Sequence, residues 1–280
     1  MTFPTACVCC GSTNHVPHLR GLRRCHGCGH IWADMNLTDD ELRALYSRNY
    51  FAGAEYLDYE KEKPALQNNF RRRLRPLTAR HPKGSALWEI GCAYGYFLEV
   101  ARDHFAVAGC DIAVEATESA RAGGLPVLTA DYLTLPAPAR PHDVVCLWDT
   151  IEHLRDPELY LEKAARELAP GGTLILSTGD IGALLPRLQG ERWRLIHPPT
   201  HLHYFSARSI TTLLQRLGLQ KVRVEYHAFW RSADAVAYRL LSVPETRATA
   251  GIYRAARKAG LLDFHFPVNT WDLMTVMATR

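Results

Sequence analysis

A chain of 280 residues is long enough to bury a full hydrophobic core, and its 47% hydrophobic and 22% charged residues are typical of an ordinary globular protein rather than a disordered chain. The net charge of +4 and the short basic run Arg71-Arg72-Arg73, which is typical of a solvated helix face, give no strong indication of nucleic-acid binding. No apolar run reaches membrane-spanning length and residues 1–6 lack the pattern of a secretory signal, so we expect a cytoplasmic protein without a membrane span.

Residues 1–33 are rich in cysteine, glycine and histidine and contain no long apolar run, so we expect them to need a metal in order to fold. Two C-x-x-C pairs, each followed by glycine, place two thiolates across a tight turn. Four thiolates leave no open position on the metal, which predicts a structural zinc ribbon. The predicted ligands are Cys7, Cys10, Cys25 and Cys28, and Cys9 is an alternative to one of its neighbours.

Residues 34–80 are predicted to form a helical cap or linker. Thr38 and Glu41 have the spacing of a capping box at the start of a helix. A second helix is predicted to carry Leu66 and Phe70, four residues apart on one face.

From residue 81 to residue 280, short apolar strands alternate with helical stretches, which is typical of an α/β fold with a parallel sheet and helices on both faces. Between about 229 and 269 the pattern is that of a helical insertion, and 272–278 is predicted to be the last strand. The other strands are predicted at 86–90, 106–110, 126–129, 142–148, 172–178 and 220–227, and the helices near 95–104, 113–122, 157–168, 206–217, 233–241 and 249–259.

The strand that ends near Glu89 is followed by a glycine turn, from Gly91 to Gly95, and then by a helix. Glycines let the backbone approach a ligand, and this loop follows the first strand at the edge where open parallel sheets bind ligands. The next strand ends in Asp111, whose carboxylate can accept hydrogen bonds from ribose hydroxyls. The loop lacks the G-x-G-x-x-G pattern for a pyrophosphate, which argues against a dinucleotide.

An acidic residue followed by hydrophobic-Gly-x-x-x-Gly resembles the first motif of class I S-adenosylmethionine-dependent methyltransferases, and the resemblance covers about residues 85–225. It implies a Rossmann-like seven-stranded sheet and S-adenosylmethionine as the cofactor. For the methionine part, the ribose and the sulfonium, the implied binding residues are Glu89, Gly91, Cys92, Ala93, Gly95, Asp111 and Trp148. For the adenine they are Ile112, Asp131 and Tyr132.

The segment after the fourth strand reaches the same edge of the sheet and contains Glu152 and His153. It resembles the Glu-His step of ubiquinone-pathway O-methyltransferases and of zinc-ribbon sugar C-methyltransferases, and in the sugar enzymes that pair is implicated in deprotonating the acceptor. We therefore expect His153 to be a general base, since imidazole titrates near neutral pH. Glu152 is expected to orient it and to favour its protonated form. His201, in a later loop rich in histidines and aromatic residues, is expected to complete the acceptor side.

The same side chains could instead bind a divalent metal ion at the acceptor site. Small-RNA 2′-O-methyltransferases hold one with a similar Glu-x-x-Glu-His-His set. The ligands in this chain would be Asp149, Glu152, His153 and either His201 or His203, with Asp149 in place of the first Glu.

The sequence thus predicts an S-adenosylmethionine-dependent methyltransferase that methylates an oxygen or a carbon of a small-molecule acceptor, such as a sugar or a natural-product intermediate. Two alternatives stay open. One is an RNA methyltransferase with the divalent metal, in which the ribbon's Arg20, Arg23 and Arg24 contact nucleic acid, and the other is a non-catalytic binding module with this fold. The sparse basic patches favour the small molecule, and the sequence carries no signal for an oligomeric state.

Overall fold

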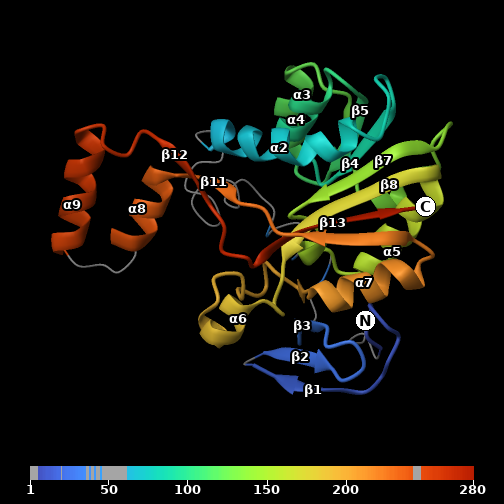
Figure 1. Cartoon of the computed structure of the whole chain (residues 1–280), viewed down its shortest axis with the longest axis horizontal. Coiled ribbons are helices and arrows are strands. Elements are labelled where there is room, and N and C mark those ends of the chain that lie inside the picture. The colour runs from blue at the N-terminus through green and yellow to red at the C-terminus, as the bar shows by residue number, and fades with distance from the viewer. Residues whose placement is uncertain are drawn as a thin grey trace.

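The computed structural model of the chain describes residues 6–19, 21–35, 38, 41, 45, 62–241 and 247–280 (Figure 1). Its centre is a seven-stranded sheet with the strand order β10-β13-β8-β7-β4-β5-β6. Strands β4 to β8 run parallel to their neighbours, whereas β13 pairs antiparallel with β8 and β10. The strands are β4 (Ala86–Ile90), β5 (Ala106–Asp111), β6 (Val127–Thr129), β7 (His142–Trp148), β8 (Leu168–Gly179), β10 (Gln220–Glu225) and β13 (Leu273–Thr279).

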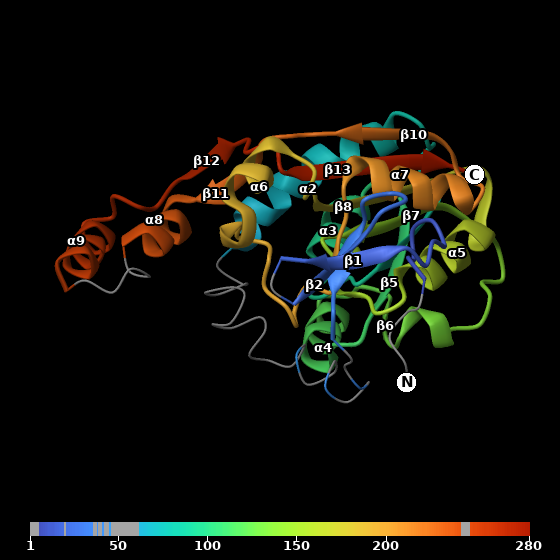
Figure 2. The same ribbon diagram turned by 90° about the horizontal axis from the view of Figure 1, so that it is seen from below.

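Helices cover both faces of this sheet (Figures 1 and 2). Val145 and Leu147 of β7 pack with α5 and α7, whereas Val144, Cys146 and Trp148 of the same strand pack with α2, α3 and α4. Successive side chains of a strand point to opposite faces, so the unbroken apolar run of β7 is explained by burial on both sides. The helices are α2 (Lys63–Thr78), α3 (Tyr96–Ala101), α4 (Val114–Ala122), α5 (Pro157–Glu167) and α7 (Ala207–Arg216).

The predicted α/β fold is confirmed, since each strand and helix expected between residues 86 and 225 is present. Strands β4 and β7 have the predicted bounds. The largest difference is at β8, which begins at Leu168 rather than at residue 172, because Leu168 already pairs with His142 and the register then shifts before Thr173 pairs with Val144.

A second sheet has the strand order β1-β2-β3-β9. Strands β1 (His15–His18), β2 (Leu22–Cys25) and β3 (Ile31–Ala33) belong to the N-terminal ribbon, whereas β9 (His203–Tyr204) precedes α7. The sequence suggested a ribbon on its own at 1–33. In the structure, antiparallel pairing of β3 with β9 joins the ribbon to a loop that is distant in sequence.

The predicted helical linker is described only in part. The amide of Glu41 donates to Thr38 Oγ1 (3.2 Å) and the amide of Thr38 donates to Glu41 Oε2 (2.7 Å), which are the two hydrogen bonds of the expected capping box. The rest of that first helix lies outside the described residues. The second predicted helix is α2, and it buries Phe70 and Leu77 against the sheet.

Residues 229–241 and 247–268 form an arm that projects from the sheet (Figures 1 and 2). Strands β11 (Phe229–Ser232) and β12 (His265–Val268) pair antiparallel and carry α8 (Ala233–Leu241) and α9 (Arg247–Lys258) at their far end. The predicted insertion is therefore helical only in its middle, since two strands of four residues are too short to show an alternating pattern. The amide group of Asn69 on α2 exchanges two hydrogen bonds with the backbone of Trp230 and so holds the base of the arm.

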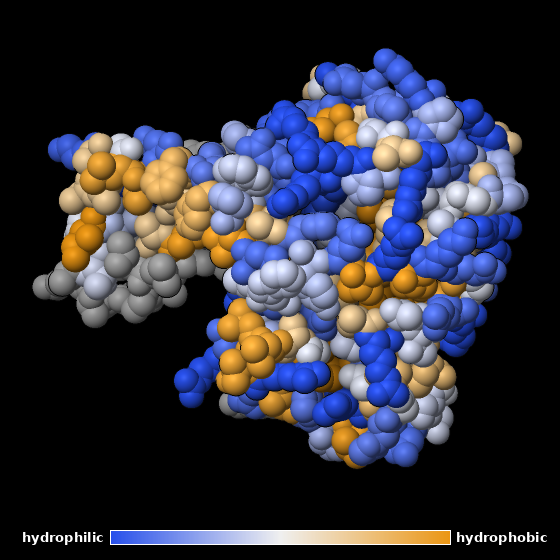
Figure 3. All heavy atoms as spheres, in the orientation of Figure 1, coloured by the Kyte–Doolittle hydropathy of each residue, from blue (hydrophilic) through white to orange (hydrophobic). Residues whose placement is uncertain are grey.

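Exposed apolar side chains gather over the arm and over α6 (Leu184–Gln189), as Figure 3 shows. They include Leu184, Leu188 and Ile252. Within the part of the chain that the structure describes, no helix is long and apolar enough to cross a membrane. Short 3₁₀ turns complete the structure: η2 (Tyr132–Thr134), η3 (Ile151–His153) and η4 (Gly190–Arg192).

Candidate active site and metal centre

The glycine loop between β4 and α3 lies against the segment that follows β7. Gly91 and Gly95 have φ angles of +74° and +72°, in the left-handed region that favours glycine. A Cβ atom on Gly91 would lie 2.5 Å from Cγ2 of Thr150, so no larger residue fits there. Thr150 immediately precedes η3, and the loop predicted to bind the cofactor therefore borders the segment predicted to face the acceptor.

Asp111, at the carboxyl end of β5, reaches across to the glycine loop. Its Oδ2 accepts a hydrogen bond from the amide of Ala93 (2.8 Å) and its Oδ1 accepts one from the amide of Ala113 (2.8 Å). Burial raises the pKa of Asp111, although these backbone hydrogen bonds act in the opposite direction. Two backbone donors thus fix the orientation of a carboxylate whose remaining lone pairs suit the two hydroxyls of a ribose.

Glu89 places a buried acceptor beneath the same loop. Its side chain is 3% exposed, and its Oε2 has no hydrogen-bond partner among the described residues. Burial and the charge of Asp111 raise its pKa well above the usual range. An unpaired buried carboxyl oxygen is costly, and a cationic donor such as the ammonium group of a bound methionine moiety would satisfy it.

The predicted adenine side divides into outward-facing and inward-facing residues. Ile112 is 40% exposed, and Asp131 caps η2 by accepting from the amide of Leu133 (2.9 Å). Tyr132 is buried instead, and its hydroxyl donates to Glu167 Oε2 (2.6 Å). Ile112 and Asp131 are therefore accessible to a nucleoside, whereas Tyr132 packs in the core.

Arg73 is a site residue that sequence reasoning missed. The basic run on α2 was interpreted as a solvated helix face, but Arg73 is only 6% exposed. Its guanidinium lies 4.9 Å from the ring centroid of Trp148 and 3.1 Å from Oδ2 of Asp149. The sequence offers one signal for this burial, since Arg73 follows Phe70 by three residues and shares its apolar face.

Asp149 keeps its charge beside this arginine. Its Oδ1 also accepts a hydrogen bond from the hydroxyl of Ser177 (2.8 Å). Burial would raise the pKa of Asp149, but the charge of Arg73 and the hydrogen bonds from Ser177 and Arg73 outweigh it, so the pKa lies below its usual value. Asp149 is therefore the ionised carboxylate at this end of β7.

Glu152, His153 and His201 come together although 48 residues separate the two histidines. One ligand atom from each of the three lies within 4.8 Å of the others. Glu152 and His153 are on η3 directly after β7, and His201 is in the loop before β9. The cluster occupies the carboxyl edge of the sheet, as the sequence predicted for the acceptor side.

The backbone fixes the orientation of both imidazoles. Nδ1 of His153 lies 2.8 Å from the carbonyl oxygen of Thr200, and Nδ1 of His201 lies 2.9 Å from that of Leu195. A carbonyl can only accept, so each Nδ1 carries the proton and each Nε2 carries the lone pair. Burial lowers the pKa of His153 to about 4 and that of His201 to about 2.

The pKa of Glu152 is raised, whereas the pKa values of the two histidines are lowered. Its side chain is buried, and one carboxyl oxygen, Oε2, has no hydrogen-bond partner among the described residues. Burial, followed by the charge of Asp149, raises the pKa of Glu152 to about 8. Glu152 is therefore protonated at neutral pH, and the expectation that its charge favours protonated His153 is not supported.

His203 does not join this cluster. Its Nδ1 lies 3.0 Å from Nε2 of His30 in the ribbon, and its Nε2 lies 3.0 Å from the carbonyl oxygen of Arg155. Of the two alternatives for a metal-ligating histidine, the geometry favours His201.

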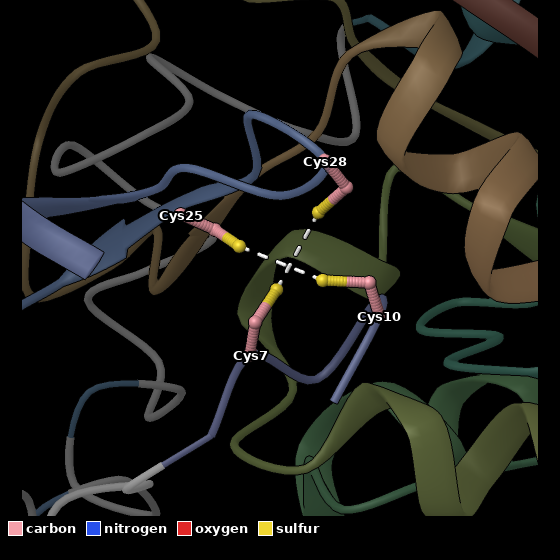
Figure 4. Close-up of side chains that lie close together, drawn as sticks. All are labelled: Cys7, Cys10, Cys25 and Cys28. Atoms are coloured by element: carbon pink, nitrogen blue, oxygen red, sulfur yellow. Dashed lines mark hydrogen bonds between the residues drawn. The ribbon is translucent and has the colours of Figure 1, made fainter. Parts of the chain in front are cut away.

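The four predicted zinc ligands converge from two turns of the ribbon, as Figure 4 shows. The sulfur atoms of Cys7 and Cys28, and those of Cys10 and Cys25, lie 3.5 Å apart. A disulfide requires about 2.05 Å, whereas sulfurs on a tetrahedral zinc with bonds of about 2.3 Å lie ~3.8 Å apart. The donor set and its spacing therefore fit a closed zinc site.

The two turns have the same hydrogen-bonding pattern. The amide of Gly11 donates to the carbonyl of Cys7, and that of Gly29 to the carbonyl of Cys25. Both glycines have φ near the left-handed region, +74° and +78°. Cys9 is fully buried beside Cys7 and Cys28 but is not one of the four converging residues.

Comparison with known families identifies the main domain. A model described as "Methyltransferase domain" matches residues 61–224, more than half of the chain. The chain belongs to this methyltransferase family. Residues 61–224 are thus a methyltransferase domain, as the glycine loop and Asp111 had led us to expect.

Curated relatives match only part of the chain. The ubiquinone biosynthesis O-methyltransferase of Caulobacter vibrioides is 39% identical over 110 residues, which are 36% of this chain and 43% of that enzyme. The methyltransferase thus spans less than half the length of this curated relative.

Solved structures agree with the fold of the methyltransferase. A SAM-dependent methyltransferase from Archaeoglobus fulgidus has a TM-score of 0.53 at 17% identity, covering 79% of this chain and 99% of that one. Phosphoethanolamine N-methyltransferase 2 from Haemonchus contortus has a TM-score of 0.52 at 13% identity, covering 89% and 61%. These likenesses establish the fold.

We expect metal analysis of this methyltransferase, purified without chelator, to find one zinc per chain. Cys25→Ser should lose that zinc and lower the thermal midpoint, because the ribbon has little apolar core of its own. Cys9→Ala is the matched control, since Cys9 is equally buried and should leave the zinc in place. Absence of zinc from the native protein would refute the ribbon, and loss of zinc in Cys9→Ala alone would make Cys9 a ligand.

Proposed function

We propose that the enzyme methylates an oxygen or a carbanion of a small-molecule acceptor, with His153 as the general base. The observation that carries this proposal is the cluster of Glu152, His153 and His201 beside the cofactor loop. Thr150 connects the glycine loop to this cluster, because it contacts Gly91 and precedes η3.

The cofactor would be held by the carboxyl ends of β4 and β5. The backbone from Gly91 to Gly95 would line the methionine part, Glu89 would face its ammonium group, and Asp111 would accept hydrogen bonds from the ribose. When bound, S-adenosylmethionine supplies a methyl group on a positively charged sulfur. Ile112 and Asp131 would contact the adenine.

His153 suits the removal of a proton from the acceptor. A pKa of about 4 leaves the imidazole neutral at physiological pH, with the lone pair on Nε2, and it also makes His153 a weaker base than an ordinary imidazole, so the imidazolium that forms needs a charged neighbour. The bond from Nδ1 to Thr200 holds the ring in one orientation, which favours an aligned transfer. Nε2 of His153 would take the acceptor proton, so that the acceptor atom could attack the methyl group that bound S-adenosylmethionine would supply, with the thioether as the leaving group.

Charge near the developing imidazolium would come from Asp149 rather than from Glu152. Asp149 is held ionised by Arg73, whereas Glu152 is protonated below about pH 8. Glu152 would then orient His153 only by lying close to it, within 4.8 Å, and the rings of His153 and His201 would pack edge to face, with centroids 4.6 Å apart.

A second candidate is a divalent metal ion at the same cluster, which would ionise an acceptor hydroxyl directly. Two imidazole nitrogens and one carboxyl oxygen within 4.8 Å form the two-histidine, one-carboxylate set that binds such ions. A metal would also convert Glu152 to its ionised form. This candidate accommodates the RNA-methyltransferase alternative.

The ribbon gives that alternative little support. Arg23 forms an ion pair with Asp34 (2.9 Å) and lies 3.0 Å from Nδ1 of His15, so its charge is used within the ribbon. Arg20 lies outside the described residues. A non-catalytic module is also less favoured, because Glu89, Gly91 and Asp111 are all in place. Mass spectrometry of candidate acceptors incubated with labelled cofactor tests turnover directly.

The variant Glu152→Gln distinguishes catalysis by a His153 base from catalysis that requires a metal ion. If His153 is the base, Glu152→Gln should keep most of its turnover at pH 7, because glutamine resembles the protonated carboxyl group that is already present. Treatment with EDTA and addition of Mn²⁺ should then change nothing. If a metal is required, Glu152→Gln should be inactive, and wild-type turnover should fall with EDTA and return with Mn²⁺.

A further inference from the structure

The ribbon and the acceptor-side cluster are connected through β9. On one side, Trp32 of β3 pairs with His203, and the amide of Ala33 donates to the carbonyl of Leu202 (2.8 Å). On the other side, the amide of Leu202 donates to the carbonyl of Glu152 (2.8 Å). Leu202 also follows His201 directly. One short segment is therefore bonded both to the ribbon and to the cluster.

Two buried histidines form a second connection. His30 is 0% exposed and His203 is 4% exposed. Because the carbonyl of Arg155 accepts from Nε2 of His203, Nδ1 of that ring accepts from Nε2 of His30. Arg155 follows His153 by two residues, so this line of hydrogen bonds ends at the turn that carries the base.

The other end of this line is a zinc turn. The amide of Cys25 donates to the carbonyl of His30 (2.8 Å), and His30 follows Cys28 by two residues. Helix α7 also holds both turns, since Arg208 donates to the carbonyl of Gly27 (3.2 Å) and Arg216 to that of Val8 (2.5 Å). Because the ribbon depends on its metal for its shape, the position of His30 depends on the metal as well.

We propose that the ribbon is needed to position the residues of the acceptor half of the active site. Through β9 and the pair His30–His203, the folded ribbon holds His201 and η3 in position, and loss of its metal impairs methyl transfer without weakening the binding of S-adenosylmethionine. His30 and His203 are positioning residues. The inference rests on the proposed function only in treating the cluster as the acceptor side.

The two halves of the site differ in what supports them. The cofactor loop is held by β4, β5 and α3, in the interior of the main sheet. The acceptor cluster is held by η3 and by β9, an edge strand of the ribbon sheet. A small displacement of a base can cost as much as a hundredfold in rate, roughly, even though nothing else in the site changes.

The test compares His203→Phe with His203→Gln. Phenylalanine keeps the aromatic packing and loses both hydrogen bonds, whereas glutamine can still donate to Arg155. We expect turnover to fall at least about tenfold in His203→Phe and to be partly rescued in His203→Gln, with the dissociation constant for S-adenosylmethionine unchanged in calorimetry. His26→Phe, at an exposed histidine in the same zinc turn, should match wild type.

Hydrogen exchange gives a readout that does not depend on turnover. In His203→Phe, and in zinc-free Cys25→Ser, the amides of residues 200–204 should exchange faster, while those of 87–95 in the cofactor strand and loop stay protected. Unchanged exchange at 200–204 in the zinc-free protein would overturn the inference, and so would equal acceleration in both segments. If His153→Ala stayed active, the proposed base would be wrong, but the exchange result would still decide the coupling.

Discussion

His153→Ala is expected to lower turnover by roughly two to four powers of ten, the usual contribution of general acid-base catalysis, while the affinity for S-adenosylmethionine stays nearly constant. Turnover and affinity should respond differently because His153 and the cofactor-binding loops lie at different places in the fold. His153 is on η3 after β7, whereas the nucleoside would be held by the loops after β4 and β5. Turnover is measured with labelled cofactor and affinity by calorimetry.

The matched control is His142→Ala. His142 begins β7 and is therefore at the opposite edge of the sheet from the site, so its loss should leave turnover intact. Full activity of His153→Ala would contradict both a His153 base and a metal held by His153, whereas similar losses on replacing Glu152, His153 or His201, with turnover that falls with EDTA and returns with Mn²⁺, would favour the metal. If activity survived every one of these changes, positioning alone would account for the transfer.

Asp111→Ala is expected to weaken S-adenosylmethionine binding by at least about a hundredfold, since it removes two charged acceptors of ribose hydrogen bonds. Part of the loss would be indirect, because Asp111 also accepts from the amide of Ala93 and so shapes the glycine loop. Calorimetry gives the affinity, and the thermal midpoint of the free protein reports any damage to the fold.

Asp103→Ala is the control for Asp111→Ala, because Asp103 is an exposed carboxylate just after α3. It should bind the cofactor as wild type does. Equal affinities of the wild-type protein and Asp111→Ala would show that the ribose is held elsewhere.

Local chemistry explains why the strand, the glycine turn and the position of Asp111 could be predicted from the sequence. A strand, a glycine turn and a helix are encoded by neighbouring residues, and the left-handed φ of Gly91 and Gly95 leaves few other residue types possible. Asp111 follows from the same reasoning, since adjacent parallel strands end at the same edge. The paired cysteines of the ribbon are likewise recognisable from spacing alone.

The acceptor half was less accessible to sequence reasoning. His201 and His203 are two residues apart in similar surroundings, yet His201 lies at the cluster and His203 faces the ribbon. The two side chains have different surroundings because β9 pairs with β3, a strand about 170 residues earlier. The sequence carries no local signal for that pairing. The protonated state of Glu152 likewise depends on burial by distant residues.

The sequence by itself determined the α/β order of strands and helices, the glycine loop and the two C-x-x-C pairs whose cysteines converge, because each depends on residues within a few turns of one another. Only the tertiary structure decided that Arg73 is buried against Trp148, that the pKa of Asp149 is lowered while that of Glu152 is raised, and that the ribbon pairs with the segment after His201. These features depend on desolvation and on contacts between distant segments, and both arise only when the chain has folded.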